Sequence, residues 1–193
     1  MPGRQAKLIS AQVLRRMLNH VQQHSRKPTR DQVIILLSVR AGLRAAEIAQ
    51  LRWPMVLDAR GRVADSLVVT DRIAKKGGGR RIPLHRELRD ALEELWRQTS
   101  DRGEPVITSA RGGALRPNSI VNWFVALFVA LDIEGCSSHS GRRTFITQAA
   151  RNAHRAGCSL RDVQLLAGHR SIETTQGYID GDTRAQRKLV GLL

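Results

Sequence analysis

The chain has 193 residues, with 32 Lys or Arg against 17 Asp or Glu, so its formal net charge is +15. The length suits one domain, and a hydrophobic fraction of 41% can fill one sizeable core. Two cysteines exclude a disulfide-rich scaffold, and the longest apolar run, residues 123–131, is too short to cross a bilayer. Because the N-terminus also lacks the apolar segment of a signal peptide, we expect a cytoplasmic protein without a membrane partner.

The basic residues are spread along the chain rather than gathered in a tail. This distribution predicts a folded surface that binds a polyanion, most often nucleic acid. The alternative is a solvated basic surface that only keeps the protein soluble.

Apolar residues at helical spacing predict a first helix that starts at Ser10 and a second over roughly Asp31 to Arg40, after a turn broken by Pro28. Gly42 is typical of a helix C-terminus, and Arg44 stands at the start of a third, short helix. Glu47 lies three residues after Arg44, so the two side chains share a helical face and can pair. A solvated surface arginine is the alternative interpretation of Arg44.

Alternation with a period of two over residues 58–84 predicts a small antiparallel sheet, with Gly77–Gly79 as the turn of a hairpin. Basic residues on both sides of this turn suit insertion along a DNA groove. They are Lys75, Lys76, Arg80 and Arg81. The glycines do not form a phosphate-binding P-loop, since the pattern GxxxxGK[ST] is absent, so we expect no nucleotide cofactor.

Further helices are predicted from His85, over residues 117–131, and from Ser138 or Ser140 to about residue 156, where Gly157 ends the helix. A capping box at residues 159–162 starts the next helix. A short helix that begins at Ser171 carries the only tyrosine of the chain. The elements together predict a mainly α fold with a small antiparallel β-sheet (α+β).

His139 and Arg142 lie three residues apart at a helix start, where free N–H groups and the helix dipole favour phosphate. Guanidinium groups suit the nonbridging oxygens of a phosphodiester, which gain charge in the transition state. The phenol of Tyr178 can act as the nucleophile if a histidine supplies a base or a positive field, and a hairpin lysine can protonate the leaving 5′-oxygen. No compact Asp/Glu cluster or pair of CxxC motifs predicts a metal site.

The order Arg, Lys, HxxR, His, Tyr resembles the catalytic domain of the tyrosine recombinases, the phage integrase family. AGLRAAEIAQLRW resembles the first arginine box of that family, HSGRRTFIT the second box, and LLAGHRSIETTQGYI the terminal motif. The resemblance covers about residues 8–180. It implies a catalytic set of Arg44, Lys75, His139, Arg142, His169 and the nucleophile Tyr178, supported by Glu47. Lys76 is the alternative general acid. Arg143 stands where the family often has histidine. The candidate DNA contacts are Lys76, Arg80, Arg81 and Arg143.

The resemblance also implies cleavage and rejoining of double-stranded DNA through a 3′-phosphotyrosyl intermediate, without metal, ATP or another cofactor. The implied assembly is a homotetramer on DNA at the nucleoid, with accessory DNA-bending proteins as further candidate partners, and the implied fold has a three-stranded sheet. We expect a lead-in segment (1–8), a catalytic domain (9–180) and a tail (181–193) that docks on a neighbouring protomer. The chain is then either a natural single-domain member or a fragment without the N-terminal DNA-binding domain. The rival functions are a DNA-binding accessory factor with a vestigial site and a type IB topoisomerase-like enzyme.

Overall fold

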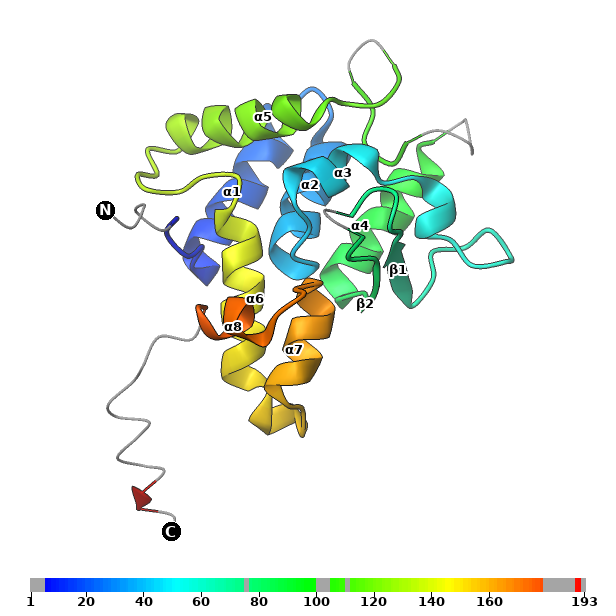
Figure 1. The fold of residues 1–193 in the computed structure, drawn as a ribbon. Helices are drawn as coiled ribbons and strands as arrows, with labels where there is room; N and C mark the ends of the chain where they lie inside the picture. The colour runs from blue at the N-terminus through cyan, green and yellow to red at the C-terminus, as the bar shows by residue number, and fades with distance from the viewer. Residues whose placement is uncertain (1–5, 75–76, 100–104, 110–111, 179–189, 192–193) are drawn as a thin grey trace.

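The computed structural model describes residues 6–74, 77–99, 105–109, 112–178 and 190–191 (Figure 1). Over these residues the named helices are α1 (Ala11–His24), α2 (Pro28–Arg40), α3 (Ala45–Gln50), α4 (Arg86–Arg97), α5 (Pro117–Ala130), α6 (Ser140–Asn152), α7 (Leu160–Ala167) and α8 (Ile172–Gln176). The strands are β1 (Ser66–Val69) and β2 (Arg80–Pro83), and two 3-10 turns cover Trp53–Met55 and His154–Ala156. The predicted α+β fold class is confirmed. Among the described helices, none combines the length and the apolar character that crossing a bilayer requires.

Helix α2 forms the centre of the main hydrophobic core. Its residues from Val33 to Val39 are all buried, so the helix has no exposed polar face in this stretch. It packs against α1, α4 and α6, while α3 packs against α5, which lies across the top of the molecule in Figure 1. The core therefore fixes the C-terminal end of α2, from which the first predicted arginine box follows.

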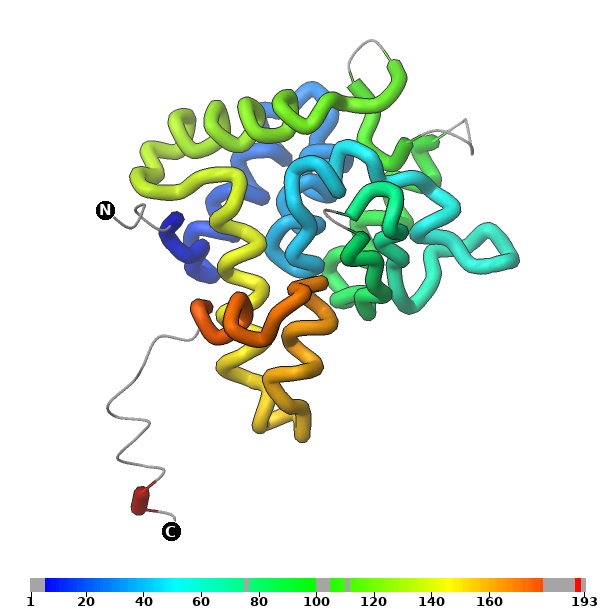
Figure 2. The backbone as a smooth tube through the Cα atoms, viewed as in Figure 1, coloured from blue at the N-terminus to red at the C-terminus, as the bar shows by residue number. Residues whose placement is uncertain are grey.

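A second, smaller hydrophobic cluster lies between α6, α7 and α8, and Figure 2 shows the chain of α7 and α8 in the lower part of the molecule. Its buried members are Ile146, Val163 and Ala167, and Tyr178 packs against them. Helix α6 joins the two clusters and approaches α2 closely at Gly141, where an added Cβ would lie 2.1 Å from Ser38 Oγ. This contact holds the N-terminal half of α6 on the main core, while the C-terminal half supports the smaller cluster.

The sheet differs from the expectation. Within the described residues it has two antiparallel strands, with Ser66 opposite Pro83 and Val69 opposite Arg80. The implied third strand is wrong, because Leu57 and Val63 form only an isolated bridge. The glycines Gly77–Gly79 also form no tight turn: they end a longer loop that leaves β1 at residue 70, and Gly79 donates its N–H to Asp71 Oδ1 at 2.8 Å.

Local signals predict most helix starts correctly, but the helix expected to run to about residue 156 ends at Asn152, and a separate 3-10 turn precedes Gly157. Ser10 caps α1, and Ser159 and Asp162 form the expected capping box of α7. The second helix begins earlier than predicted, because Pro28 occupies its first turn, where a missing N–H costs nothing. Helix α8 ends before the prediction, so Tyr178 lies in the turn that follows it.

Candidate active site

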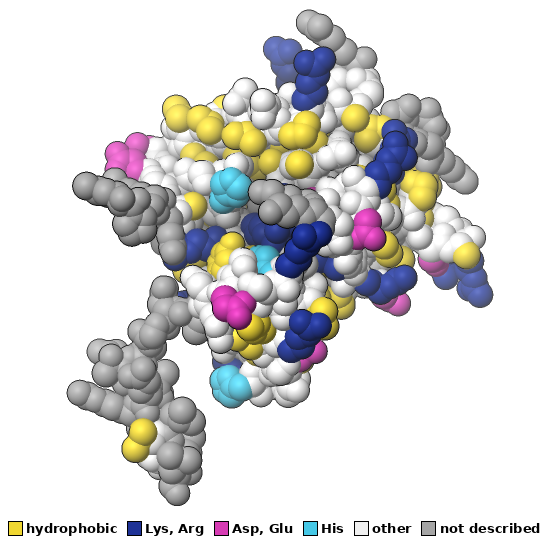
Figure 3. All heavy atoms as spheres, viewed as in Figure 1, with side chains coloured by type: hydrophobic (Ala, Val, Ile, Leu, Met, Phe, Trp, Pro, Cys, Tyr) yellow, Lys and Arg dark blue, Asp and Glu magenta, His cyan; other side chains and the backbone are white. Residues whose placement is uncertain are grey.

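A pocket of about 400 Å³ opens where α6, the turn after α7 and the turn after α8 meet. Figure 3 shows Lys, Arg and His side chains around a hollow in the middle of this face. The residues that line the pocket are Ala6, Arg44, His139, Arg142, Arg143, His169, Thr174, Gly177 and Tyr178. Five of the six predicted catalytic residues therefore meet in one place. The sixth, Lys75, and its alternative Lys76 lie outside the described residues. A larger pocket, of about 630 Å³, lies by the start of α2 and contains none of the predicted site residues.

Arg44 reaches the pocket because α2 ends in a sharp turn. Gly42 has a positive φ of 63°, which favours glycine, and its close approach to the Phe145 ring leaves no room for a Cβ. Arg44 then caps α3, and the Glu47 carboxylate accepts its backbone N–H at 2.8 Å and its Nη1 at 3.0 Å. The pairing predicted from the spacing of Arg44 and Glu47 is confirmed. Because Glu47 is buried, it holds the exposed part of Arg44 in one orientation.

Arg142 is the most deeply placed of the lining arginines, with 4% of its surface exposed. Its Nη1 donates to the Gly42 carbonyl at 2.7 Å and its Nη2 to the Ala167 carbonyl at 2.6 Å, so one side chain joins the ends of α2 and α7. Burial, followed by the charges of Arg44 and Arg80, lowers the pKa of the Arg142 guanidinium to about 10. The group stays charged at neutral pH, and no carboxylate binds it directly among the hydrogen bonds of the described residues.

His169 lies between Arg142 and Tyr178. Its Nε2 is 3.1 Å from Arg142 Nη2 and its Nδ1 is 3.0 Å from Thr175 Oγ1. Because a guanidinium can only donate, Nε2 is the acceptor, and Nδ1–H donates to the threonine. Burial, followed by the charges of Arg142 and Arg44, lowers the pKa of His169 to about 4. The imidazole is therefore neutral at neutral pH, and its ring stacks on Tyr178 with centroids 5.5 Å apart.

The depressed pKa of His169 predicts a stability that depends on pH. Between about pH 4 and pH 6.5 the unfolded chain binds a proton at this imidazole more readily than the folded protein does. The contribution of His169 to the free energy of unfolding is therefore fully present above pH 6.5 and is lost as the pH falls towards 4. Urea unfolding at a series of pH values should show a shallower loss for His169→Asn than for the wild type. An identical pH dependence in the two proteins would contradict the assigned protonation.

Tyr178 is held by contacts on two sides. Its backbone N–H donates to the Thr175 carbonyl at 3.1 Å, and its carbonyl lies 3.4 Å from the Thr147 hydroxyl of α6. Its ring packs between the smaller hydrophobic cluster and His169. The phenol is therefore presented at the wall of the pocket that also contains Arg44 and Arg142.

His139 and Arg143 complete the rim of this pocket. His139 is exposed and precedes the first residue of α6, as its position in the sequence indicated. Arg143 is partly buried and donates to the Ala6 carbonyl at 2.6 Å, which fixes the N-terminal segment against α6. Arg81 is exposed on β2, where its Nη1 donates to Ser66 Oγ at 3.0 Å.

The structure corrects the prediction for Arg80. This residue was expected to face DNA from the hairpin, but 3% of its side chain is exposed and its guanidinium binds the Glu47 carboxylate. The strand alternation already contained this signal: Arg80 shares a face of β2 with the buried Ile82, whereas Arg81 lies on the exposed face.

In the part of the chain that the structure describes, no three His, Cys, Asp or Glu side chains gather in a metal-binding arrangement.

The chain is a mainly α domain with one pocket lined by a tyrosine, two histidines and three arginines. The chain belongs to the phage integrase family. The family model described as "Phage integrase family" matches residues 7–184.

Individual relatives agree with this membership. The chain is 30% identical over 161 residues to the tyrosine recombinase XerC of Anoxybacillus flavithermus, over 77% of this chain and 49% of that protein. It is 27% identical over 201 residues to the tyrosine recombinase XerD of Vibrio cholerae, over 98% of this chain and 62% of that protein. The chain thus spans about half the length of the XerC protein. A structure of the Tn1549 transposon integrase in complex with a circular intermediate DNA has a TM-score of 0.75 at 17% identity, over 100% of this chain and 67% of that one, and this likeness establishes the fold.

Proposed function

We propose that the chain is the catalytic part of a site-specific DNA recombinase, which cleaves and rejoins double-stranded DNA through a 3′-phosphotyrosyl intermediate. The observation that carries the proposal is the meeting of Tyr178, Arg44 and Arg142 in one pocket. Family membership and the net charge of +15 support a DNA substrate. A relative of the same fold, the Tn1549 integrase, was solved in complex with DNA.

The chemistry follows from the positions of these side chains. Arg44 and Arg142 bind the nonbridging oxygens of the scissile phosphate and stabilise the charge that develops on them. The Tyr178 oxygen attacks phosphorus, so a phosphotyrosyl bond forms while the bond to the 5′-oxygen breaks. His139, on the rim, accepts the phenol proton, and Lys75 or Lys76 gives a proton to the leaving oxygen. His169, neutral and bound to Arg142, orients that arginine. Attack by a 5′-hydroxyl reverses these steps, and no ATP is needed because the ester bond is exchanged.

A nicked duplex tests this function. Cleavage close to a nick releases a short fragment, and its loss traps the protein on the 3′-phosphate. We expect the wild type to form an adduct that survives denaturing electrophoresis, and sequencing of the attached strand identifies the target site. Salt-dependent binding without any adduct on such substrates would instead support the accessory-factor function. Relaxation of supercoiled plasmid without sequence preference would support the topoisomerase-like function.

We propose further that residues 9–180 act as the catalytic domain and that the tail, residues 181–193, docks on a neighbouring protomer of a DNA-bound tetramer at the nucleoid. The tail ends in apolar residues, Leu189, Val190, Leu192 and Leu193. Val190 is 69% exposed, so this side chain buries little surface on its own chain.

Deletion of residues 184–193 should weaken assembly on DNA while a single site is still cleaved on a nicked duplex. Native gel electrophoresis measures the fraction of paired-site complexes, and the denaturing gel measures cleavage in the same samples. The control replaces Arg187 and Lys188 with Gln, which removes charge from the tail but keeps its apolar residues. Unchanged pairing of two sites by the deletion variant would exclude docking of the tail.

A further inference from the structure

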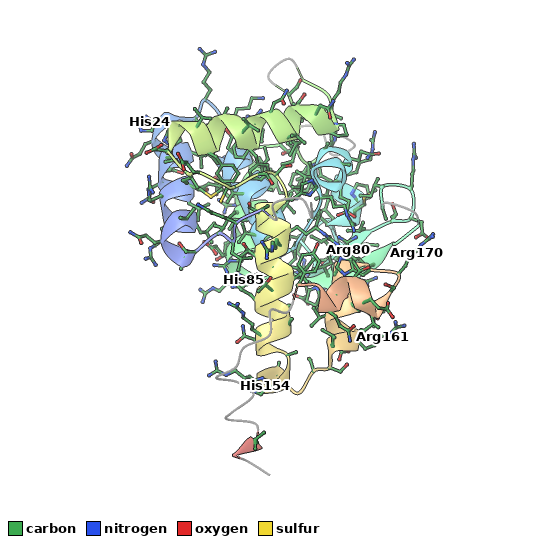
Figure 4. The ribbon with its side chains drawn as sticks, turned by 60° about the vertical axis from the view of Figure 1, so that its left-hand side comes forward. His24, Arg80, His85, His154, Arg161 and Arg170 are labelled. Atoms are coloured by element: carbon green, nitrogen blue, oxygen red, sulfur yellow. The ribbon has the colours of Figure 1, made fainter. Side chains whose placement is uncertain are left out.

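Arg80 does not line the pocket, but it contacts two of the segments that build it: α3, which follows Arg44, and the end of α7, which precedes His169. Its Nη1 and Nη2 bind the two oxygens of Glu47 at 2.9 Å and 3.0 Å, in a bidentate pair. Its Nε donates to the Leu166 carbonyl at 3.0 Å. Figure 4 shows Arg80 inside the molecule, whereas Arg161 and Arg170 project outwards. Arginine is among the residues least often buried. A buried arginine with this set of partners therefore indicates a specific structural or functional role.

We infer that Arg80 is a positioning residue of the active site, which occupies the Glu47 carboxylate so that the Arg44 guanidinium stays directed at the pocket. The inference rests on the proposed function, in which Arg44 binds the scissile phosphate. Arg80 itself lines no part of the pocket and touches no reacting atom in this arrangement.

The geometry of Glu47 supports this division of roles. Each of its oxygens accepts two hydrogen bonds: Oε1 from Nη1 of Arg80 and Nη1 of Arg44, and Oε2 from Nη2 of Arg80 and the backbone N–H of Arg44. Arg80 thus takes the bidentate position, and Arg44 is bound through one guanidinium nitrogen only. Without Arg80, a buried carboxylate beside Arg44 would form the stronger bidentate pair with it. That pair would turn the Arg44 donors away from the phosphate.

The electrostatics lead to the same conclusion. Burial alone would raise the pKa of the Glu47 carboxyl, but the hydrogen bonds and charge of Arg80, followed by those of Arg44, hold it below its ordinary value. Glu47 is therefore ionised with 1% of its side chain exposed. A buried carboxylate of this kind needs a full counter-charge, and Arg80 supplies one without consuming that of Arg44.

A second set of contacts extends the role of Arg80 to His169. The Leu166 carbonyl binds Arg80 and the next carbonyl, that of Ala167, binds Arg142, so two arginines cap the C-terminus of α7. Gly168 follows with φ of 63°, and an added Cβ there would lie 2.9 Å from Arg80 Cδ. Arg80 therefore packs directly under the turn that leads to His169.

Arg80→Met, which keeps the length of the side chain but removes its charge, is the principal variant. Single-turnover cleavage of a nicked duplex should slow by about 10²-fold, the scale expected for a misplaced active-site group. Affinity for the same duplex should change by no more than about threefold, because a duplex, unlike free phosphate, keeps its contacts with the many other basic side chains of the protein. A rate within about threefold of the wild type would overturn the inference.

The double variant Glu47→Gln/Arg80→Met separates positioning from packing. Gln can still complete the cap of α3, but it carries no charge that would draw Arg44 away. We expect it to cleave on the order of tenfold faster than Arg80→Met alone. If Arg80 served only to pack against Gly168, the double variant would be no faster than the single one. Arg80→Lys, which keeps the charge without the bidentate fork, should lie between the wild type and Arg80→Met, and it remains testable if Arg80→Met does not fold.

Binding of inorganic phosphate to the DNA-free protein gives a readout that needs no cleavage. The His169 ring signals in NMR report binding in the pocket, and we expect Arg80→Met to weaken it by on the order of tenfold. The control Arg151→Gln, which removes an exposed arginine of α6, should leave it unchanged. Equal phosphate affinity of the wild type and Arg80→Met would overturn the positioning role. If the wild type forms no DNA adduct, the proposed function fails, and this titration still tests Arg80.

Discussion

Tyr178→Phe is expected to abolish the covalent protein–DNA adduct while duplex binding stays within about threefold of the wild type. The variant removes only the phenol oxygen, which is the proposed nucleophile, so adduct formation should fall by at least about 10³-fold. The ring itself should keep its place, because it is held by stacking on His169 and by packing against the smaller hydrophobic cluster. The measurement is the denaturing-gel assay on a nicked duplex, with binding followed in parallel by native gel shift.

Thr174→Val is the matched control for this variant. Thr174 also lines the pocket. Its hydroxyl, like that of Tyr178, can be removed with little change in the shape of the side chain. We expect this variant to form the adduct at a rate within about tenfold of the wild type, since the hydroxyl has no chemical role in the proposal. An adduct that persists in Tyr178→Phe would assign the nucleophile to another residue.

The second large effect is expected for Arg142→Gln. In the proposed mechanism Arg142 donates to the scissile phosphate, so loss of the guanidinium should lower the cleavage rate by about 10²- to 10³-fold. Affinity for uncleaved duplex should change much less, because the interaction strengthens only as charge develops in the transition state. Single-turnover rates and native gel shifts on the same substrate separate the two quantities.

Arg142→Gln should also lower the free energy of unfolding. The carbonyls of Gly42 and Ala167 lose their partner in the interior, and an unpaired buried polar group costs about 1–3 kcal/mol. Arg151→Gln, on the exposed end of the same helix, controls for the loss of one positive charge. Equal losses of affinity and of cleavage rate in Arg142→Gln would contradict its role in the transition state.

The parts of the site that could be predicted from the sequence are those set by local rules. Spacing alone indicated that Arg44 pairs with Glu47, and the capping residues Ser10 and Ser159 marked the starts of two helices. The resemblance to the recombinase motifs added a prediction of which residues, distant in the chain, would lie together. Five of the six residues predicted in this way line one pocket. Periodicity could not have supplied that result, because Arg44 and Tyr178 are brought together by tertiary contacts, among them the packing of α6 on α2 and the hydrogen bonds of Arg142 to the ends of α2 and α7.

The errors concern contacts between segments that are distant in the chain. Arg80 was interpreted as a DNA contact because basic residues beside glycines suggest an exposed hairpin. Its actual partner, Glu47, lies 33 residues away, and a local pattern does not reveal such a pair. The third strand was expected for a similar reason. Alternation shows which residues can form a strand, but it does not show whether they pair with an adjacent strand.

The smaller hydrophobic cluster has a consequence for how the protein loses activity. Among the residues that the structure describes, it contains three buried apolar residues, whereas the main core contains more than thirty, so its cooperative opening should require much less free energy than global unfolding. Tyr178 packs against this smaller cluster and His169 stacks on Tyr178, whereas Arg44 follows α2, the helix at the centre of the main core. Mild heating or denaturant can therefore separate the nucleophile from its phosphate-binding partner while most of the backbone stays native. Inactivation would then come before unfolding, and the temperature at which cleavage stops would lie below the melting temperature of the helices.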